Sequence, residues 1–143
     1  MIKKIEEAIL EKLRSLEKIK LLAVPIVDFK EVRQSIILNL QYISETFTVP
    51  NEKKAIFAPL PTKKRVSDMT FNITLYYKDL RNNFEDIYDV FDSIVERLHG
   101  EQLEIEGINV SPIYIKNIEF RERNTQNFIV YNCSLEIKCC QVD

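Results

Sequence analysis

The residues able to do acid–base, nucleophilic or metal chemistry are few and lie far apart in the sequence. His99 is the single histidine, and the three cysteines, Cys133, Cys139 and Cys140, all lie near the C-terminus. A nucleophilic pair would require His99 to meet a cysteine across the fold. An odd number of cysteines without C-x-x-C spacing favours neither a disulfide framework nor zinc. We interpret the cysteines as small hydrophobes of a strand and His99 as a cation at a helix end.

Paired carboxylates are the other candidate chemistry, because they can hold a cation or act as acid and base. Five acidic residues follow the wet side of one expected helix, which favours simple solvation: Glu85, Asp86, Asp89, Asp92 and Glu96. The only glycines, Gly100 and Gly107, exclude a phosphate-binding loop and a dinucleotide fingerprint. A small enzyme would still need an apolar pocket with convergent polar groups. We therefore predict a protein that is not an enzyme and has no metal or cofactor.

Composition places the chain among ordinary globular proteins. Its 143 residues (16.9 kDa), 45% hydrophobic and 29% charged, predict one domain over residues 1–143. A net charge of −2 disfavours a dedicated nucleic-acid binder. No apolar run approaches the roughly 18 residues that a membrane span needs, and the charged first twenty residues are unlike a signal peptide. We expect a protein made in the cytoplasm without a membrane partner.

The clearest structural pattern lies in residues 69–100. Apolar and polar residues alternate over Thr70–Lys78, which predicts a half-buried strand of an antiparallel sheet. The apolar spacing then becomes helical and forms one broad stripe: Phe84, Ile87, Tyr88, Phe91, Ile94, Val95 and Leu98. Gly100 supplies the left-handed stop of this helix. The strand and helix together form the predicted centre of the fold.

The remaining elements complete an α+β prediction: a mainly antiparallel sheet with two amphipathic helices packed on one face. The first helix is expected over residues 2–18, and strands are expected over Ser35–Ile43, Ile113–Arg121 and Phe128–Cys140. The apolar phase of the second of these strands slips between Ile115 and Ile118, which indicates a bulge. The last two strands should pair as a hairpin, and Arg121–Asn127 should form the turn between them. Two weaker strand candidates lie within residues 19–34 and Leu103–Val110.

The opposite sheet face is expected to be polar, which suits either solvent or a subunit contact. A long loop is expected at about residues 46–68, because this stretch holds three prolines and clusters of charge. Its basic run, Lys63-Lys64-Arg65, is either a solvated tip or part of an interface. The candidate interface or lumen residues of this loop are Lys53, Lys54, Phe57, Lys63, Lys64 and Arg65.

Four stretches together resemble the small tail-completion or tail-terminator proteins of Mu-like contractile-tailed phages and prophages. They are the N-terminal amphipathic helix, the apolar strand Ser35–Tyr42, the strand Phe71–Leu80 with its helix ending at Arg97–Gly100, and the aromatic-bearing strand Phe128–Cys140. The resemblance spans most of the chain and consists of patterns of residue type.

This resemblance implies a non-enzymatic structural protein of the virion tail, assembled in the host bacterial cytoplasm. Such subunits form a homo-oligomer, a hexameric ring at the head-proximal end of the tail, which ends tube or sheath polymerisation. The implied partners are the tail tube and sheath proteins and the head–tail connector. Lys63, Lys64 and Arg65 would then surround a lumen through which DNA passes. The alternative function is a small nucleic-acid-binding α+β module, whose oligonucleotide binding would weaken with salt.

Overall fold

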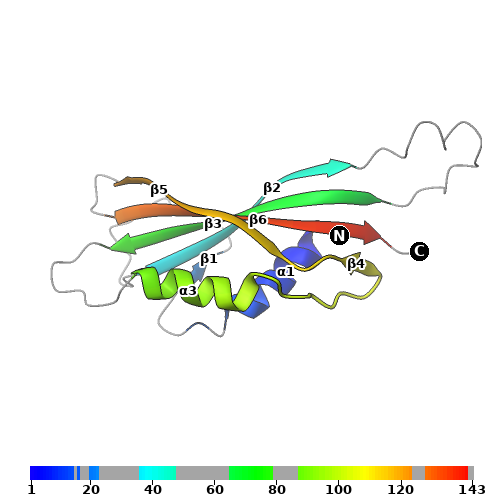
Figure 1. The fold of residues 1–143 in the computed structure, drawn as a ribbon, viewed down its shortest axis with the longest axis horizontal. Helices are drawn as coiled ribbons and strands as arrows, with labels where there is room; N and C mark the ends of the chain where they lie inside the picture. Colours follow the sequence, from blue (N-terminus) through cyan, green and yellow to red (C-terminus); the bar gives the residue numbers. More distant parts are fainter. Residues whose placement is uncertain are drawn as a thin grey trace, which may run out of the picture.

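The computed structural model describes residues 1–14, 16, 20–22, 36–47, 65–78, 87–123 and 128–141. Within them, two helices pack on one face of a long twisted sheet (Figure 1). The helices are α1 (Ile2–Leu13) and α3 (Ile87–Leu98). The strands are β1 (Lys20–Leu22), β2 (Ile36–Phe47), β3 (Val66–Lys78), β4 (Ile108–Val110), β5 (Tyr114–Arg123) and β6 (Phe128–Gln141). The predicted α+β class is confirmed.

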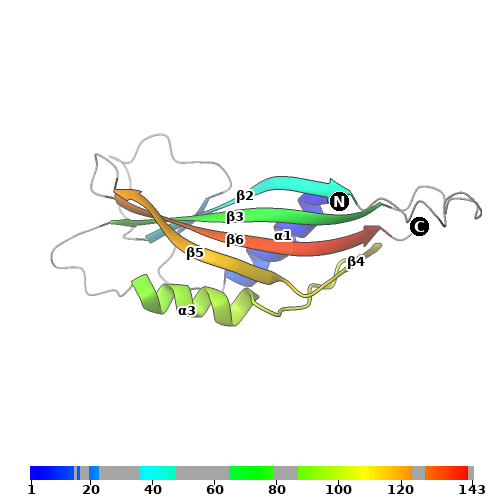
Figure 2. The same ribbon diagram turned by 45° about the horizontal axis from the view of Figure 1, so that its top comes forward.

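The sheet is built around β3 and β6, which pair antiparallel along the whole length of β3. The strand order is β1-β2-β3-β6, and the far side of β6 is shared by β5 and β4. Figure 2 shows β2, β3, β6 and β5 side by side in that order. The pairings are antiparallel except that of β1 with β2, which is parallel. The predicted hairpin of the last two strands is therefore confirmed.

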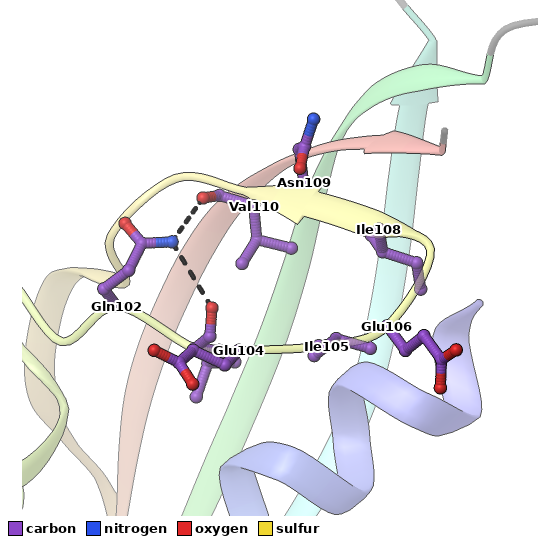
Figure 3. Close-up of a pocket in the computed structure, with 8 residues that line it drawn as sticks. Gln102, Glu104, Ile105, Glu106, Ile108, Asn109 and Val110 are labelled. Atoms are coloured by element: carbon purple, nitrogen blue, oxygen red, sulfur yellow. Dashed lines mark hydrogen bonds between the residues drawn. The ribbon is translucent and has the colours of Figure 1, made fainter. Parts of the chain in front are cut away.

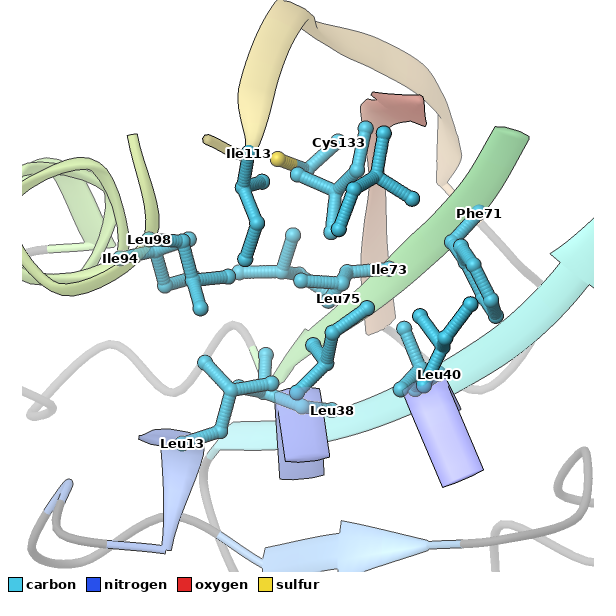
Figure 4. Packing of buried hydrophobic residues seen from close by; sticks show 14 of the residues in the cluster. Leu13, Leu38, Leu40, Phe71, Ile73, Leu75, Ile94, Leu98, Ile113 and Cys133 are labelled. Carbon is cyan, nitrogen blue, oxygen red and sulfur yellow. The ribbon is translucent and has the colours of Figure 1, made fainter. Parts of the chain in front are cut away.

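The core lies between the two helices and the sheet face that they cover. Alternation along β3 is as predicted, because Phe71, Ile73 and Leu75 are fully buried while the residues between them are only half-buried. Figure 4 shows these side chains packed with residues of β2, α1 and α3. The buried residues that the helices contribute are Ile5, Ile9, Leu13, Ile87, Ile94 and Leu98.

Strand β5 carries the bulge that its sequence predicted. The register with β6 shifts between Ile115 and Asn117, so Ile115 and Ile118 both pack against the core. A second shift, between Phe120 and Glu122, was not predicted. The strand continues to Arg123, so the first part of the predicted turn Arg121–Asn127 belongs to β5.

The stretch predicted as a loop at about 46–68 contains strand residues at both of its ends, and residues 48–64 lie outside the described residues. Strand β2 runs to Phe47 and β3 begins at Val66, with Thr46 opposite Asp68. A bulge between Tyr42 and Ser44 interrupts the alternation along β2. The sequence pattern therefore stops there although the hydrogen-bonded ladder continues.

The buried stripe of α3 contains fewer apolar residues than predicted. Tyr88 and Val95 are 64% and 37% exposed, although their spacing placed them with the core residues of α3. The helix lies beside β5, at one edge of the sheet, so this flank of α3 extends beyond the covered surface (Figure 2). Gly100, with φ of 78°, follows α3 as predicted, and Gly107 with the same φ turns the chain into β4.

Candidate interaction surface

Conventional catalytic or metal-binding groups do not converge in the described part of the chain. No set of three or more His, Cys, Asp or Glu side chains there could hold a metal ion. Asp89, Asp92 and Glu96 are exposed on the outer side of α3, which confirms the solvated interpretation for these three residues. Glu85 and Asp86 lie outside the described residues.

The cysteines behave as hydrophobes of β6. Cys133 and Cys139 are buried, and this burial raises the pKa of the Cys133 thiol to about 12 and that of the Cys139 thiol to about 11. Both thiols therefore stay protonated at neutral pH and are poor nucleophiles. Cys140 is only half-buried, and all three cysteines are free.

His99 follows the last residue of α3, and its role there as a cation stays a prediction. Its Nδ1 accepts a hydrogen bond from the backbone N–H of Ile115 at 3.0 Å. The ring also lies 5.3 Å from that of Tyr114, measured between centroids. His99 therefore fastens the end of α3 to the start of β5.

A hollow of about 650 Å³ lies within the segment 102–110 (Figure 3). Gln102 holds the segment in shape by donating from Nε2 to the carbonyl oxygen of Val110 at 2.6 Å. Glu104 and Glu106 are exposed and lie at different ends of the hollow in Figure 3. Since its walls come from one short stretch and its polar groups do not converge, we assign this hollow no chemistry.

A partly buried ion pair lies beyond α1, where β2 and β3 leave the core. The side chain of Glu45 is 3% exposed and accepts hydrogen bonds from the Arg65 guanidinium, with Nε at 2.8 Å, and from the Ser67 hydroxyl. The guanidinium also lies over the ring of Phe47, 5.6 Å from its centroid. The bond from Arg65 holds the pKa of the Glu45 carboxyl below its usual value, although burial opposes this shift. We call Glu45, Arg65 and Ser67 the β2–β3 clamp.

The clamp bears directly on the predicted lumen residues. Arg65 is the one candidate among the described residues; its guanidinium pairs with Glu45 and is 31% exposed, and its place in a lumen stays a prediction. The other five candidates lie outside the described residues: Lys53, Lys54, Phe57, Lys63 and Lys64. Sequence spacing could not reveal the pair, because Glu45 and Arg65 are brought together by the β2–β3 ladder.

The edge of the sheet formed by β5 carries a row of aromatic rings. Phe120 contacts Tyr131 edge-on with 5.9 Å between centroids, Tyr131 contacts Phe91 at 4.9 Å, and Phe91 contacts Tyr88 at 6.0 Å. Both ends of this aromatic row are in solvent, because Phe120 is 60% exposed and Tyr88 is 64% exposed. Among the described residues, the outer side of β5 has no partner strand. At this edge, exposed aromatic side chains therefore lie beside a strand that no other described strand pairs with on its outer side.

The opposite edge, formed by β2, is also open. Strand β1 pairs only with Ile37–Asn39, so Leu40–Phe47 has no outer partner among the described residues. Ile43 and Phe47 are 50% and 58% exposed, and Val66 of the neighbouring strand is 40% exposed. Every exposed large hydrophobic residue of the described chain therefore lies either at this end of β2 and β3 or along α3 and β5.

The sheet face away from the helices is mostly polar, as predicted. A hollow of about 280 Å³ on this face is lined largely by amide and hydroxyl side chains. Arg121 also lines this hollow and lies 3.7 Å from Glu119. With the Asn132 amide oriented so that its oxygen faces Arg121, the guanidinium donates hydrogen bonds to that oxygen. The face is not polar throughout, because Ile37 and Val130 are buried on it.

The chain matches no model of a known protein family, and a search of curated proteins finds no match either. In the described residues, no helix is both long and apolar enough to cross a membrane. Any proposal about function therefore rests on the surface features of the described residues.

Proposed function

We propose that this protein is a structural subunit of a contractile phage tail, assembling as a homo-oligomeric ring, expected to be hexameric, at the head-proximal end. The ring stops growth of the tail tube or sheath and joins the tail to the head connector. The observation that carries the proposal is the sheet of the described residues, which has two different edges without an outer strand, both bearing exposed apolar side chains. Unlike edges on one subunit make a heterologous contact, which closes into a ring when the rotation between copies permits.

The chemistry of the described residues agrees with a scaffold. Polar side chains cover much of the face away from the helices, and they are engaged within the sheet instead of being directed at a common point. Asn72 donates to Thr74 at 3.1 Å, for example, and Lys116 pairs with Glu136 at 2.6 Å. Such a face offers neutral hydrogen-bonding groups to neighbouring proteins without a reactive group.

The nucleic-acid alternative finds less support. A nucleic-acid-binding face carries a stripe of lysine and arginine, whereas the polar face here carries mainly amides and hydroxyls. Phe120 and Tyr88 could stack on bases, but the exposed acidic residues Asp89 and Asp92 lie on α3 near Tyr88. Their negative charge disfavours a nearby phosphate backbone.

The proposal is tested by growing tail tube from its purified subunit with and without this protein. We expect substoichiometric amounts to stop tube growth and the protein to be found at one end of each tube by electron microscopy. Tubes whose length and ends are unaffected by the protein would refute the proposal. Strong, salt-sensitive oligonucleotide binding by the isolated chain would instead support the alternative function.

A further inference from the structure

The two open edges differ in a way that suggests which surfaces meet. The exposed side chains of β2 beyond its pairing with β1 are uncharged: Gln41, Ile43, Ser44, Thr46 and Phe47. Such an edge has no charge that prevents another strand from pairing with it. Strand β5, in contrast, carries five charged residues between Lys116 and Arg123, so an arbitrary strand is discouraged from pairing there.

Several of the charges on β5 are already paired within the subunit. Lys116 pairs with Glu136 at 2.6 Å, and Arg121 lies 3.7 Å from Glu119. A strand that brought further charges to this edge would compete with these pairs. A strand whose exposed side chains are uncharged and partly apolar would leave them intact, and it could cover Phe120 at the end of the aromatic row. The β2 edge has these properties.

A second copy of the chain is therefore the occupant that fits the β5 edge. Pairing β2 with β2 of another copy would be isologous and would leave the aromatic row of each copy in water. Pairing β2 of one copy with β5 of the next occupies the β2 edge and the β5 edge at once. It also leaves the same two edges free at the ends of the pair, so that further copies can add.

We infer that the subunits join head to tail, with the Leu40–Phe47 edge of β2 in one copy pairing beside β5 and the aromatic row of the next. This inference rests on the proposed function, because it names the partner surface of the same assembly. The contact continues the sheet from one subunit into its neighbour through backbone hydrogen bonds. The partner is a second copy of this chain.

The test uses two lysine variants that each disable one edge. Ile43→Lys places a charge on the β2 edge, and Phe120→Lys places one on the β5 edge; at 50% and 60% exposure both side chains can be replaced without unfolding the core. Glu7→Gln, on the exposed side of α1, makes the same change in net charge outside both edges and is the matched control. Circular dichroism and melting temperature establish that each variant is folded.

The masses in solution, measured with and without tube ends, then distinguish the arrangements. We expect the wild-type chain and Glu7→Gln to assemble, each lysine variant alone to remain a 16.9 kDa monomer, and an equal mixture of the two to stop at dimers. A dimer is the limit because each mixed pair uses the one intact edge of each partner. Rings that assemble in this way but fail to stop tube growth would refute the proposed function and support the pairing.

Three results would overturn the inference. A lysine variant that assembles like the wild type would show that its edge is not in the interface. Dimers of Phe120→Lys alone would indicate isologous pairing through β2. A wild-type chain that stays monomeric at every concentration, with tube ends present, would show that the edges do not meet.

Discussion

Replacing Glu45 by Gln tests whether the β2–β3 clamp holds the end of the sheet together. The carboxylate is 3% exposed and accepts bonds from Arg65 and Ser67, so the substitution leaves the guanidinium beside a neutral amide. Breaking a buried ion pair costs about 3–5 kcal/mol. Arg65 is 31% exposed and can regain water, and the amide oxygen still accepts one bond, so we expect a loss of about 2–3 kcal/mol.

The clamp also predicts how this loss depends on pH. Because the pKa of Glu45 is lowered in the folded protein, the folded state binds fewer protons at this site than the unfolded state. Its contribution is therefore fully present above the unfolded pKa, near 4.3, and is lost as the pH falls through the folded pKa. The difference between wild type and Glu45→Gln should be constant around neutral pH and should shrink on acidification.

Urea unfolding at a series of pH values measures both effects. Glu119→Gln is the matched control, because it makes the same chemical change in an exposed pair, 3.7 Å from Arg121, and should cost less than about 1 kcal/mol. A loss below about 0.5 kcal/mol for Glu45→Gln at neutral pH would contradict the clamp. So would a difference between the two proteins that grows as the pH is lowered.

Three further predictions concern the core and β6. Ile94→Ala, at a fully buried position, should lower the free energy of unfolding by about 3–4 kcal/mol, measured with denaturant. A loss below about 1 kcal/mol would show that Ile94 does not face the core. Phe91→Ala should lower the free energy of unfolding by about 2–3 kcal/mol, because the ring is only partly buried but lies 4.9 Å from the ring of Tyr131. A loss as large as that expected for a fully buried Phe would contradict this placement. A thiol reagent at pH 8 should label Cys140 quickly in the native protein, and Cys133 and Cys139 only after unfolding; rapid labelling of all three in the native state would show that β6 is more open than described.

The sequence predicted the elements whose local pattern depends directly on which side chains are buried. Alternation predicted the buried face of β3, and the phase slip near Ile115 predicted the bulge of β5, because each depends on which side chains face the core. Helical spacing predicted the core residues of α3 in the same way, since Ile94 and Leu98 face the sheet.

What the sequence could not predict depends on contacts between distant segments. The exposure of Tyr88 follows from the position of α3 at the sheet edge, which spacing along a helix does not contain. The partner of Arg65 follows from the β2–β3 ladder, which continues past a bulge that disrupts the apolar pattern. The two open edges depend on strand order, and no local pattern specifies that order.

The proposed ring is best tested by the mass of the purified protein, measured across a wide concentration range with and without polymerised tail tube. We expect an assembly whose mass is a multiple of the 16.9 kDa subunit, six copies for the proposed ring, either free or on tube ends. A persistent monomer that does not bind tube ends would contradict it.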